Sequence, residues 1–94
     1  MHDELRPDEA LMLAYRDGDA AAFEALYARH RSRLYRYLAH QCGDSRLAEE
    51  ATHDVFLNLW QHPEAYDASR GPFAGWLFRV ARNRAISVIR FPRR

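Results

Sequence analysis

The sequence predicts an all-α fold: a compact bundle of three main helices preceded by a short N-terminal helix. Apolar residues recur at three- and four-residue spacing through three long stretches, which is the period of one helix face. No stretch shows the alternation of β-branched residues that marks a strand, and glycine and proline fall only at a few boundaries. A length of 94 residues suffices for one small domain with a modest core.

The limits of the first two helices follow from residues that cap or stop a helix. Asp8 is expected to cap a short helix that ends at Arg16. Asp19 is expected to cap a long helix over residues 20–41, which stops at Gly43 because glycine readily adopts the left-handed conformation of a helix end.

Two further helices follow the same rules. Asp44 is expected to cap a third helix that runs to about Gln61, and Pro72 to be the first residue of a fourth helix that runs to about Arg90. Residues 62–71 between them form the longest irregular segment. The predicted apolar faces comprise Phe23, Leu26, Tyr27, His30, Leu34, Tyr37, Leu38 and Gln41 in the second helix, Leu47, Ala48, Ala51, Thr52, Val55, Phe56 and Leu59 in the third, and Phe73, Leu77, Val80, Ala81, Ala85 and Val88 in the fourth.

Charges are strongly segregated along the chain, although the net charge is only +1. Residues 1–67 hold seven arginines against thirteen acids, a net charge of −6, whereas residues 68–94 hold seven arginines and no acid. Aromatic residues are interleaved with these C-terminal arginines. Rings stack on bases while guanidinium groups contact phosphates, so the pattern predicts that the C-terminal part binds nucleic acid with accessible bases.

Within the fourth helix, Arg79, Arg82 and Arg90 are expected to face outward, where they can neutralise phosphates. Asn83 lies on the flank, and its amide can read a base edge by a paired donor and acceptor. The alternative is a helix that arginines merely solubilise, but solubilising faces usually mix both signs of charge. Arg84 is expected to snorkel or to pair with an acid of another helix, and it is assigned no DNA contact.

The irregular segment is a candidate site for a flipped-out base, which is read only where a pocket stacks it and hydrogen-bonds it. From the residues alone, a base-binding loop and a plain connector are equally favoured. Phe73 is expected to line such a pocket, and Trp76 to belong mainly to the core. The candidate loop residues provide a ring, donors, acceptors and a close backbone approach: Tyr66, Asp67, Ser69, Arg70 and Gly71.

A polar stripe lies outside the apolar face of the third helix, with Leu57 exposed within it. Such a stripe suits docking onto a basic partner helix. Periodicity alone nevertheless favours an ordinary solvated face. The candidate docking residues are Glu50, His53, Asp54, Leu57, Asn58 and Gln61.

Catalytic and cofactor signatures are absent from the sequence. The five histidines include no pair at i and i+4, and Cys42 has no partner cysteine. There is no glycine-rich phosphate loop and no serine elbow. We therefore expect a protein that is not an enzyme and needs no cofactor or metal, with His30 a satisfied core residue. No apolar run is long enough to cross a membrane, which predicts a cytoplasmic protein without membrane insertion.

Three segments, in this order, resemble the second conserved domain (region 2) of bacterial extracytoplasmic-function (ECF) sigma factors. The likeness covers residues 8–90, so residues 1–94 are expected to form one such domain. The segments are Gly18-Asp-Ala-Ala-Ala-Phe-Glu-Ala-Leu-Tyr27 with Arg33-Leu-Tyr-Arg-Tyr-Leu38, then Ala48-Glu-Glu-Ala-Thr-His-Asp-Val-Phe-Leu-Asn-Leu-Trp60, and Phe73 to Arg90.

The resemblance implies a sigma-factor domain with two functional surfaces. The third helix would bind core RNA polymerase at the coiled coil of the beta-prime subunit. The loop and the fourth helix would recognise and melt the promoter −10 element and capture a base of the non-template strand, with Asn83 taking part. An anti-sigma factor is a further implied partner.

The chain departs from this family in two respects. Members normally continue into a helix-turn-helix domain that reads the −35 element, and these 94 residues contain nothing of it. His53 and Asp54 stand where the family often has Gln and Glu, and both changes keep a polar group.

Two other classes compete with this interpretation. A duplex-binding helix-turn-helix protein would place a turn of three or four residues before its recognition helix, whereas the connector here is longer. A pure protein-interaction bundle would leave the basic C-terminal part unexplained.

Overall fold

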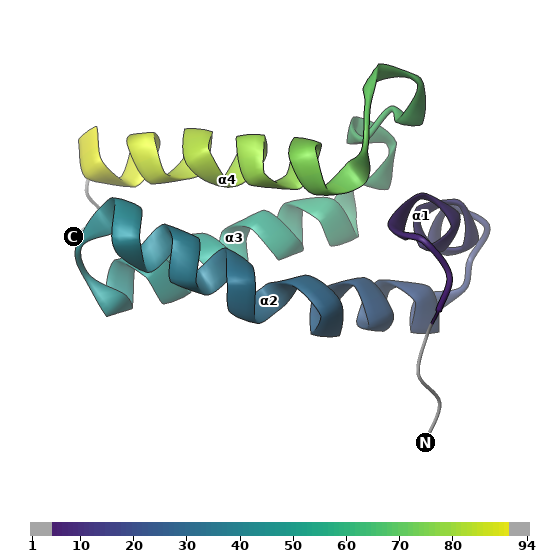
Figure 1. Ribbon diagram of the computed structural model, residues 1–94, viewed down its shortest axis with the longest axis horizontal. Helices are drawn as coiled ribbons and strands as arrows, with labels where there is room; N and C mark the ends of the chain where they lie inside the picture. Colours follow the sequence, from purple (N-terminus) through teal and green to yellow (C-terminus); the bar gives the residue numbers. More distant parts are fainter. Residues whose placement is uncertain (1–4, 91–94) are drawn as a thin grey trace.

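The computed structural model describes residues 5–90 and confirms the all-α bundle (Figure 1). Its elements are α1 (Asp8–Arg16), α2 (Ala20–Cys42), α3 (Ser45–Gln61), the short 3₁₀ turns η1 (Pro63–Ala65) and η2 (Ala68–Arg70), and α4 (Phe73–Arg90). Helices α2, α3 and α4 lie side by side, with α2 and α4 parallel and α3 antiparallel to both. Helix α1 sits at the end of the bundle where α2 and α4 begin.

Two of the three predicted aspartate caps are confirmed. The Asp19 carboxylate accepts a hydrogen bond from the amide of Ala21 at the start of α2. Asp44 accepts from the amides of Arg46 and Leu47, at 2.8 and 3.3 Å, at the start of α3. These bonds satisfy donors that have no partner within the first helical turn.

The ends of α2 and α4 differ only slightly from the expected ones. Helix α2 ends at Cys42, and the following Gly43 has a φ of 67°, in the left-handed region that a Cβ atom disfavours. Helix α4 begins at Phe73, one residue later than expected. Pro72 lies just outside it, and the Pro72 carbonyl accepts from the Trp76 amide at 3.2 Å.

The expected cap at Asp8 is wrong. Pro7 occupies the cap position of α1, and no side chain caps the helix. The Asp8 carboxylate instead accepts from Arg29 Nη1 and lies against His30 Nε2, each at 2.9 Å, so it joins α1 to α2. Tertiary partners therefore prevail over the local preference of aspartate for a cap.

The core is one cluster to which every α-helix contributes. Its largest fully buried side chains are those of Leu11 and Met12 in α1, Leu26, Leu34 and Leu38 in α2, Leu59 in α3, and Phe73 and Leu77 in α4. Small residues also belong to the core: Ala48 and Ala51 of α3 and Ala81 and Ala85 of α4 are buried. Each large side chain contributes about 1.5–3 kcal/mol through its removal from water.

The predicted apolar faces of α3 and α4 are confirmed, and that of α2 is confirmed in part. Tyr27 is 38% exposed, and its ring packs edge-on against Phe56 with 4.9 Å between ring centroids. Gln41 is exposed, whereas Ala22, which the sequence analysis omitted, is fully buried. No described helix within residues 5–90 is long and apolar enough to span a bilayer.

Removal of the α3 cap should destabilise the fold measurably. Asp44→Ala leaves the amides of Arg46 and Leu47 without their side-chain partner, so we expect it to lower the free energy of unfolding by about 1 kcal/mol. Asp44→Ser should retain most of that stability. The measurement is urea unfolding, with Asp17→Ala at an exposed position as the matched control. Equal effects of Asp44→Ala and Asp17→Ala would contradict the role of this cap.

Candidate functional site

An open pocket lies where the interhelical loop meets the first turns of α4. We call it the loop–α4 pocket; its volume is about 530 Å³. That volume lies within the range of pockets that bind small organic groups. It is lined by Ala65, Tyr66, Asp67, Arg70, Gly71, Pro72, Gly75, Trp76, Arg79, Val80 and Asn83.

The pocket brings together six of the ten residues that the sequence analysis proposed for DNA binding: Tyr66, Asp67, Arg70, Gly71, Arg79 and Asn83. The other four do not line it. Ser69 lies in the loop, Phe73 lies beneath the pocket, and Arg82 and Arg90 lie exposed along α4.

The expected roles of the aromatic residues are largely reversed. Phe73 is fully buried, so its ring is part of the core and does not line the pocket. Trp76, expected mainly in the core, is half-buried: it packs against the core cluster and also forms a wall of the pocket. The Tyr66 ring is 2% exposed and stands edge-on to Phe73, so in this conformation it offers no open face for stacking.

Tyr66 instead fixes the turn that leads into α4. Its hydroxyl donates a hydrogen bond to the Gly71 carbonyl at 2.7 Å. Burial raises the pKa of the Tyr66 phenol, and the negative charges of Glu9, Asp67 and Asp8 raise it further. The phenol therefore keeps its proton and remains a donor. Gly71 has a φ of 135°, a backbone conformation that residues with a Cβ atom rarely adopt. The glycine therefore makes this turn possible.

Asp67 and Ser69 form a local hydrogen-bonded unit at the rim of the pocket. Asp67 Oδ1 accepts from the Ser69 amide at 3.0 Å and from the Ser69 hydroxyl at 2.7 Å, and it caps η2. These bonds lower the pKa of the Asp67 carboxyl, and the charges of Arg70 and Arg16 lower it further. Asp67 therefore presents an anionic acceptor at the pocket, while Ser69 holds it in place.

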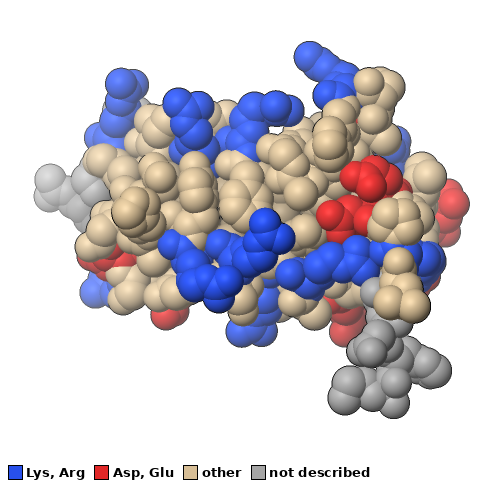
Figure 2. Space-filling model, viewed as in Figure 1, with Lys and Arg blue, Asp and Glu red and all other residues tan. Residues whose placement is uncertain are grey.

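Three of the four arginines of α4 form a row along one edge of the molecule. Arg79, Arg82 and Arg90 are exposed, and α4 contains no acid. Figure 2 shows this basic edge, with acidic side chains grouped mainly at the end of the molecule near α1. A single-sign row of this kind suits a polyanion such as a nucleic-acid backbone.

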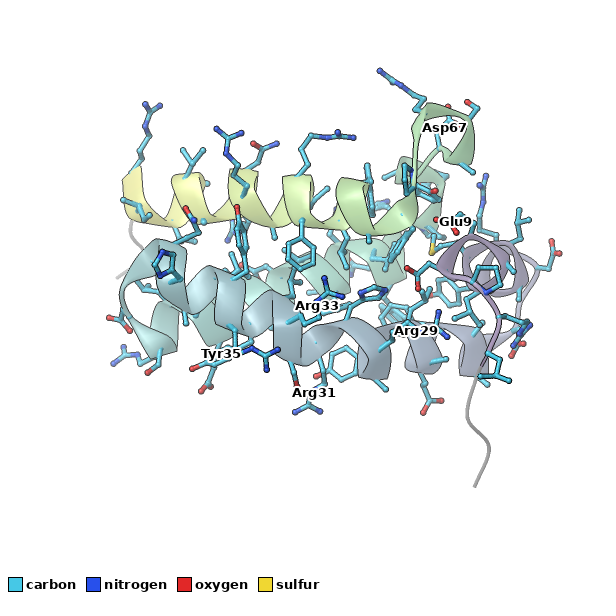
Figure 3. All side chains as sticks on the ribbon, in the orientation of Figure 1. Glu9, Arg29, Arg31, Arg33, Tyr35 and Asp67 are labelled. Atoms are coloured by element: carbon cyan, nitrogen blue, oxygen red, sulfur yellow. The ribbon has the colours of Figure 1, made fainter. Side chains whose placement is uncertain are left out.

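The arginines of α2 have mixed environments (Figure 3). Arg29 is bound to the Asp8 carboxylate and to the Arg6 carbonyl, each at 2.9 Å, so it is structural. Arg31 lies over the Tyr27 ring and Arg33 over the Phe78 ring, at 5.4 and 5.8 Å from the ring centroids. Both arginine side chains are exposed, and each guanidinium group makes a cation–π contact with the ring beneath it.

The proposed docking residues of α3 lie on a ridge between two grooves. The groove between α3 and α4 has a volume of about 460 Å³. Four of the predicted docking residues line it: Asp54, Leu57, Asn58 and Gln61. His53 and Leu57 line the groove between α2 and α3. Leu57 lines both grooves and is 39% exposed, as the sequence predicted, while Glu50 is half-buried and lines neither.

Asp54 has a structural partner within the domain. Its Oδ2 accepts from Arg84 Nε at 3.0 Å and from Arg84 Nη2, which joins α3 to α4. The expected pairing of Arg84 with an acid of another helix is therefore confirmed. Both side chains are about one quarter exposed, so any role of Asp54 in binding a partner must be separated experimentally from this ion pair.

Several residues of these surfaces were missed by the sequence analysis. Trp76 shares the three- and four-residue spacing of Arg79, Val80 and Asn83, which places it on their face, and that signal could have been used. Trp60 is 54% exposed and borders the α2–α3 groove with Phe23 and Phe56. Asn83 lines the α3–α4 groove as well as the loop–α4 pocket, which no local signal indicates.

Within the part of the chain that the structure describes, the remaining side chains that could carry chemistry assemble no second site. His30 is buried, with Nε2 against Asp8, but its Nδ1 has no hydrogen-bond partner, so the expected satisfied histidine is satisfied at one nitrogen only. Cys42 is half-buried, and burial together with the charge of Asp44 raises the pKa of its thiol. Among residues 5–90, no three or more His, Cys, Asp or Glu side chains gather as metal ligands would.

Comparison with known proteins places the chain in a family. Residues 26–94 match the family described as Sigma-70 region 2. The ECF RNA polymerase sigma factor SigL of Mycobacterium tuberculosis is 40% identical over 75 residues, which are 80% of this chain and 42% of SigL. The ECF RNA polymerase sigma factor SigK of Mycolicibacterium vanbaalenii is 35% identical over 82 residues, which are 87% of this chain and 42% of SigK.

The fold and the site together define an all-helical domain with a pocket beside an arginine-bearing helix and a separate exposed helix face. The chain belongs to the Sigma-70 region 2 family, and the two curated relatives that it resembles are ECF RNA polymerase sigma factors. It spans about 42% of the length of these two relatives. Membership of this family supports the expectation that the chain is not an enzyme.

The hydrogen bonds from Ser69 should control the titration of Asp67. Ser69→Ala removes the hydroxyl donor, the largest cause of the lowered pKa, so we expect the Asp67 pKa to rise toward the ordinary value for aspartate. NMR titration of the Asp67 carboxyl carbon measures it, with Ser87→Ala on α4 as the matched control. Because the folded-state pKa is depressed, the stabilisation is present above the ordinary aspartate pKa and is lost as pH falls through the folded-state pKa. An unchanged Asp67 titration in Ser69→Ala would contradict the assigned hydrogen bond.

Proposed function

We propose that this chain acts in transcription initiation as the domain of an ECF sigma factor that binds core RNA polymerase and recognises and melts the promoter −10 element. Family membership supports the sigma-factor role. The observation that carries the DNA-binding part is the loop–α4 pocket, where Asp67, Trp76 and Asn83 line one cavity beside exposed arginines. The domain would work in the cytoplasm with the polymerase.

The pocket suits one unstacked base of the non-template strand. The half-buried ring of Trp76 supplies a stacking surface, and the Asn83 amide offers a donor and an acceptor to a base edge. The anionic Asp67 accepts a hydrogen bond from an exocyclic amino group. Asparagine pairs with adenine through two hydrogen bonds, so these side chains favour an amino-bearing base such as adenine.

Melting follows from selective binding to the unpaired state. The pocket accepts a base only after it has left the duplex, so occupancy shifts the equilibrium toward the open form. Extraction of a base costs a few kcal/mol. Stacking on an aromatic ring returns about 1–3 kcal/mol per base. The free energy gained by stacking in the pocket thus roughly offsets the cost of extracting one base. The rest of the melted region must be held by phosphate contacts from Arg79, Arg82 and Arg90 and by the polymerase.

Polymerase docking is assigned to the α3 ridge. An exposed apolar anchor ringed by polar groups is the common arrangement of an interface hot spot, and Leu57 beside Asn58 and Gln61 has it. The acids of α3 suit a basic partner helix, as the beta-prime coiled coil would present.

The proposed binding surface for an anti-sigma factor is the groove between α2 and α3, which borders the α3 ridge. Trp60, Leu57 and Tyr27 are 54%, 39% and 38% exposed, and they border one groove between α2 and α3. A regulatory protein that covers these side chains would also cover Leu57, and it would thereby exclude the polymerase.

Substitution of Asn83 should change sequence preference, not only affinity. For Asn83→Ala we expect a loss of about 1–3 kcal/mol of base discrimination at one position, because the paired amide contacts are removed. The measurement is selection from a random −10 library by the domain bound to core polymerase. Arg82→Ala is the matched control, and it should weaken binding to all sequences alike. It should also reduce the slope of log affinity against log salt concentration by about one. An unchanged selected sequence for Asn83→Ala would refute its role in specificity.

The contribution of Asp54 to polymerase binding can be separated from its ion pair with Arg84. Asp54→Arg should lower the affinity for core RNA polymerase by about tenfold, because an interfacial acid is lost. Co-elution of the domain with the polymerase measures this loss. The double variant Asp54→Arg with Arg84→Asp restores an ion pair of reversed polarity. We expect it to regain thermal stability but not polymerase binding.

Recovery of polymerase binding by that double variant would mean that Asp54 acts only through the packing of α3 against α4. If the wild-type domain itself fails to co-elute with the polymerase yet binds a labelled oligonucleotide, the chain is an independent DNA-binding module. If it binds neither, it is a protein-interaction bundle of another kind.

A further inference from the structure

The first turn of α4 is capped by a side chain from the opposite end of the chain. Pro72 precedes the helix, and proline has no side-chain acceptor that could serve as a cap. Glu9 in α1 takes this place: its Oε2 accepts from the Phe73 amide at 2.8 Å, across 64 positions of sequence. Figure 3 shows Glu9 at the point where α1 meets the loop and the start of α4.

The bond formed by Glu9 satisfies a donor that water does not reach. Phe73 is fully buried, so its amide would lack a partner without the carboxylate. A carboxylate at a helix N-terminus also interacts favourably with the helix dipole. Glu9 thus holds the first turn of α4 in its observed position.

That first turn carries one wall of the loop–α4 pocket. Trp76 and Gly75 line the pocket from the turn that begins at Phe73, and the Tyr66 ring lies 5.2 Å from the Phe73 ring, centroid to centroid. The charge of Glu9 also acts on Tyr66, the phenol of which fixes the turn at Gly71. Glu9 does not line the pocket itself, so it supports the pocket from behind.

Helix α1 is itself fixed to the bundle at both ends. Asp8 binds Arg29 and contacts His30 of α2 at its beginning. Near its other end, the Tyr15 hydroxyl donates to the Trp60 carbonyl of α3 at 2.8 Å. A helix anchored in this way presents the Glu9 carboxylate at a defined place.

We propose that Glu9 is a positioning residue for base capture, acting through the Phe73 amide on the orientation of Trp76. This inference rests on the proposed function of the loop–α4 pocket. It adds α1 to the DNA-binding machinery, although α1 lies outside residues 26–94 that match the family.

The test compares Glu9→Ala, Glu9→Gln and the wild type for binding of single-stranded DNA in the presence of core polymerase. The probe is the fluorescein-labelled short oligonucleotide that the wild type enriches most from a random single-stranded pool. We expect Glu9→Ala to weaken binding about tenfold, because the first turn of α4 no longer holds Trp76 in its observed orientation. Glu9→Gln keeps an amide oxygen as acceptor and should restore most of the affinity. Glu24→Ala, an exposed acid of α2, controls for the change in net charge.

A second readout follows the hydrogen bond directly. Hydrogen exchange of the Phe73 amide should accelerate in Glu9→Ala and remain close to the wild-type rate in Glu9→Gln. Co-elution with core polymerase should be the same for all three proteins, because the α3 ridge lies elsewhere. This separates a positioning role from general unfolding.

Three outcomes would overturn the inference. One is equal oligonucleotide binding by Glu9→Ala and the wild type. Another is tighter binding by both Glu9 variants, which would mark Glu9 as a repulsive charge. The third is unchanged exchange of the Phe73 amide in Glu9→Ala. Failure of the wild type to enrich any oligonucleotide would instead refute the proposed function of the pocket.

Discussion

The structure depends most on the burial of one aromatic ring, that of Phe73, where four segments of the chain meet. The ring is fully buried, with the rings of Tyr66, His30 and Trp76 at centroid distances of 5.2, 5.7 and 5.8 Å. Through these contacts the loop, α2 and α4 share one cluster of rings, and α1 joins it by the bond from Glu9 to the Phe73 amide. The first turn of α4, which carries Trp76, is therefore packed directly on the core.

The segregation of charge gives the two surfaces different characters. Helix α4 carries arginines and no acid, and its one arginine near the interior, Arg84, is neutralised by Asp54 from α3. The remaining arginines stay available at the edge. Because the acids lie mostly in the first two-thirds of the chain, the polar side of α3 can meet a basic protein while the edge of α4 meets a polyanion.

Helical periodicity predicted the fold and the helical part of the pocket, because it reports which residues share a face. It placed Arg79 and Asn83 together, and it would have placed Trp76 with them. It also placed Phe73 on the apolar face of the fourth helix, where the residue is buried. The loop residues of the pocket were proposed from their side-chain chemistry instead. Periodicity did not predict that the loop residue Tyr66 is buried, because the position of this ring depends on packing against Phe73 and Trp76 of α4. The role of Asp8 was missed for the same reason: its partners Arg29 and His30 lie in another helix.

The two tryptophans of the chain are divided between its two surfaces: Trp76 lines the loop–α4 pocket and Trp60 borders the α2–α3 groove. Each surface therefore carries its own intrinsic fluorophore. With either indole replaced by phenylalanine, the emission of the remaining one reports on a single surface. The order in which the proposed DNA and protein partners arrive then becomes observable without any attached dye.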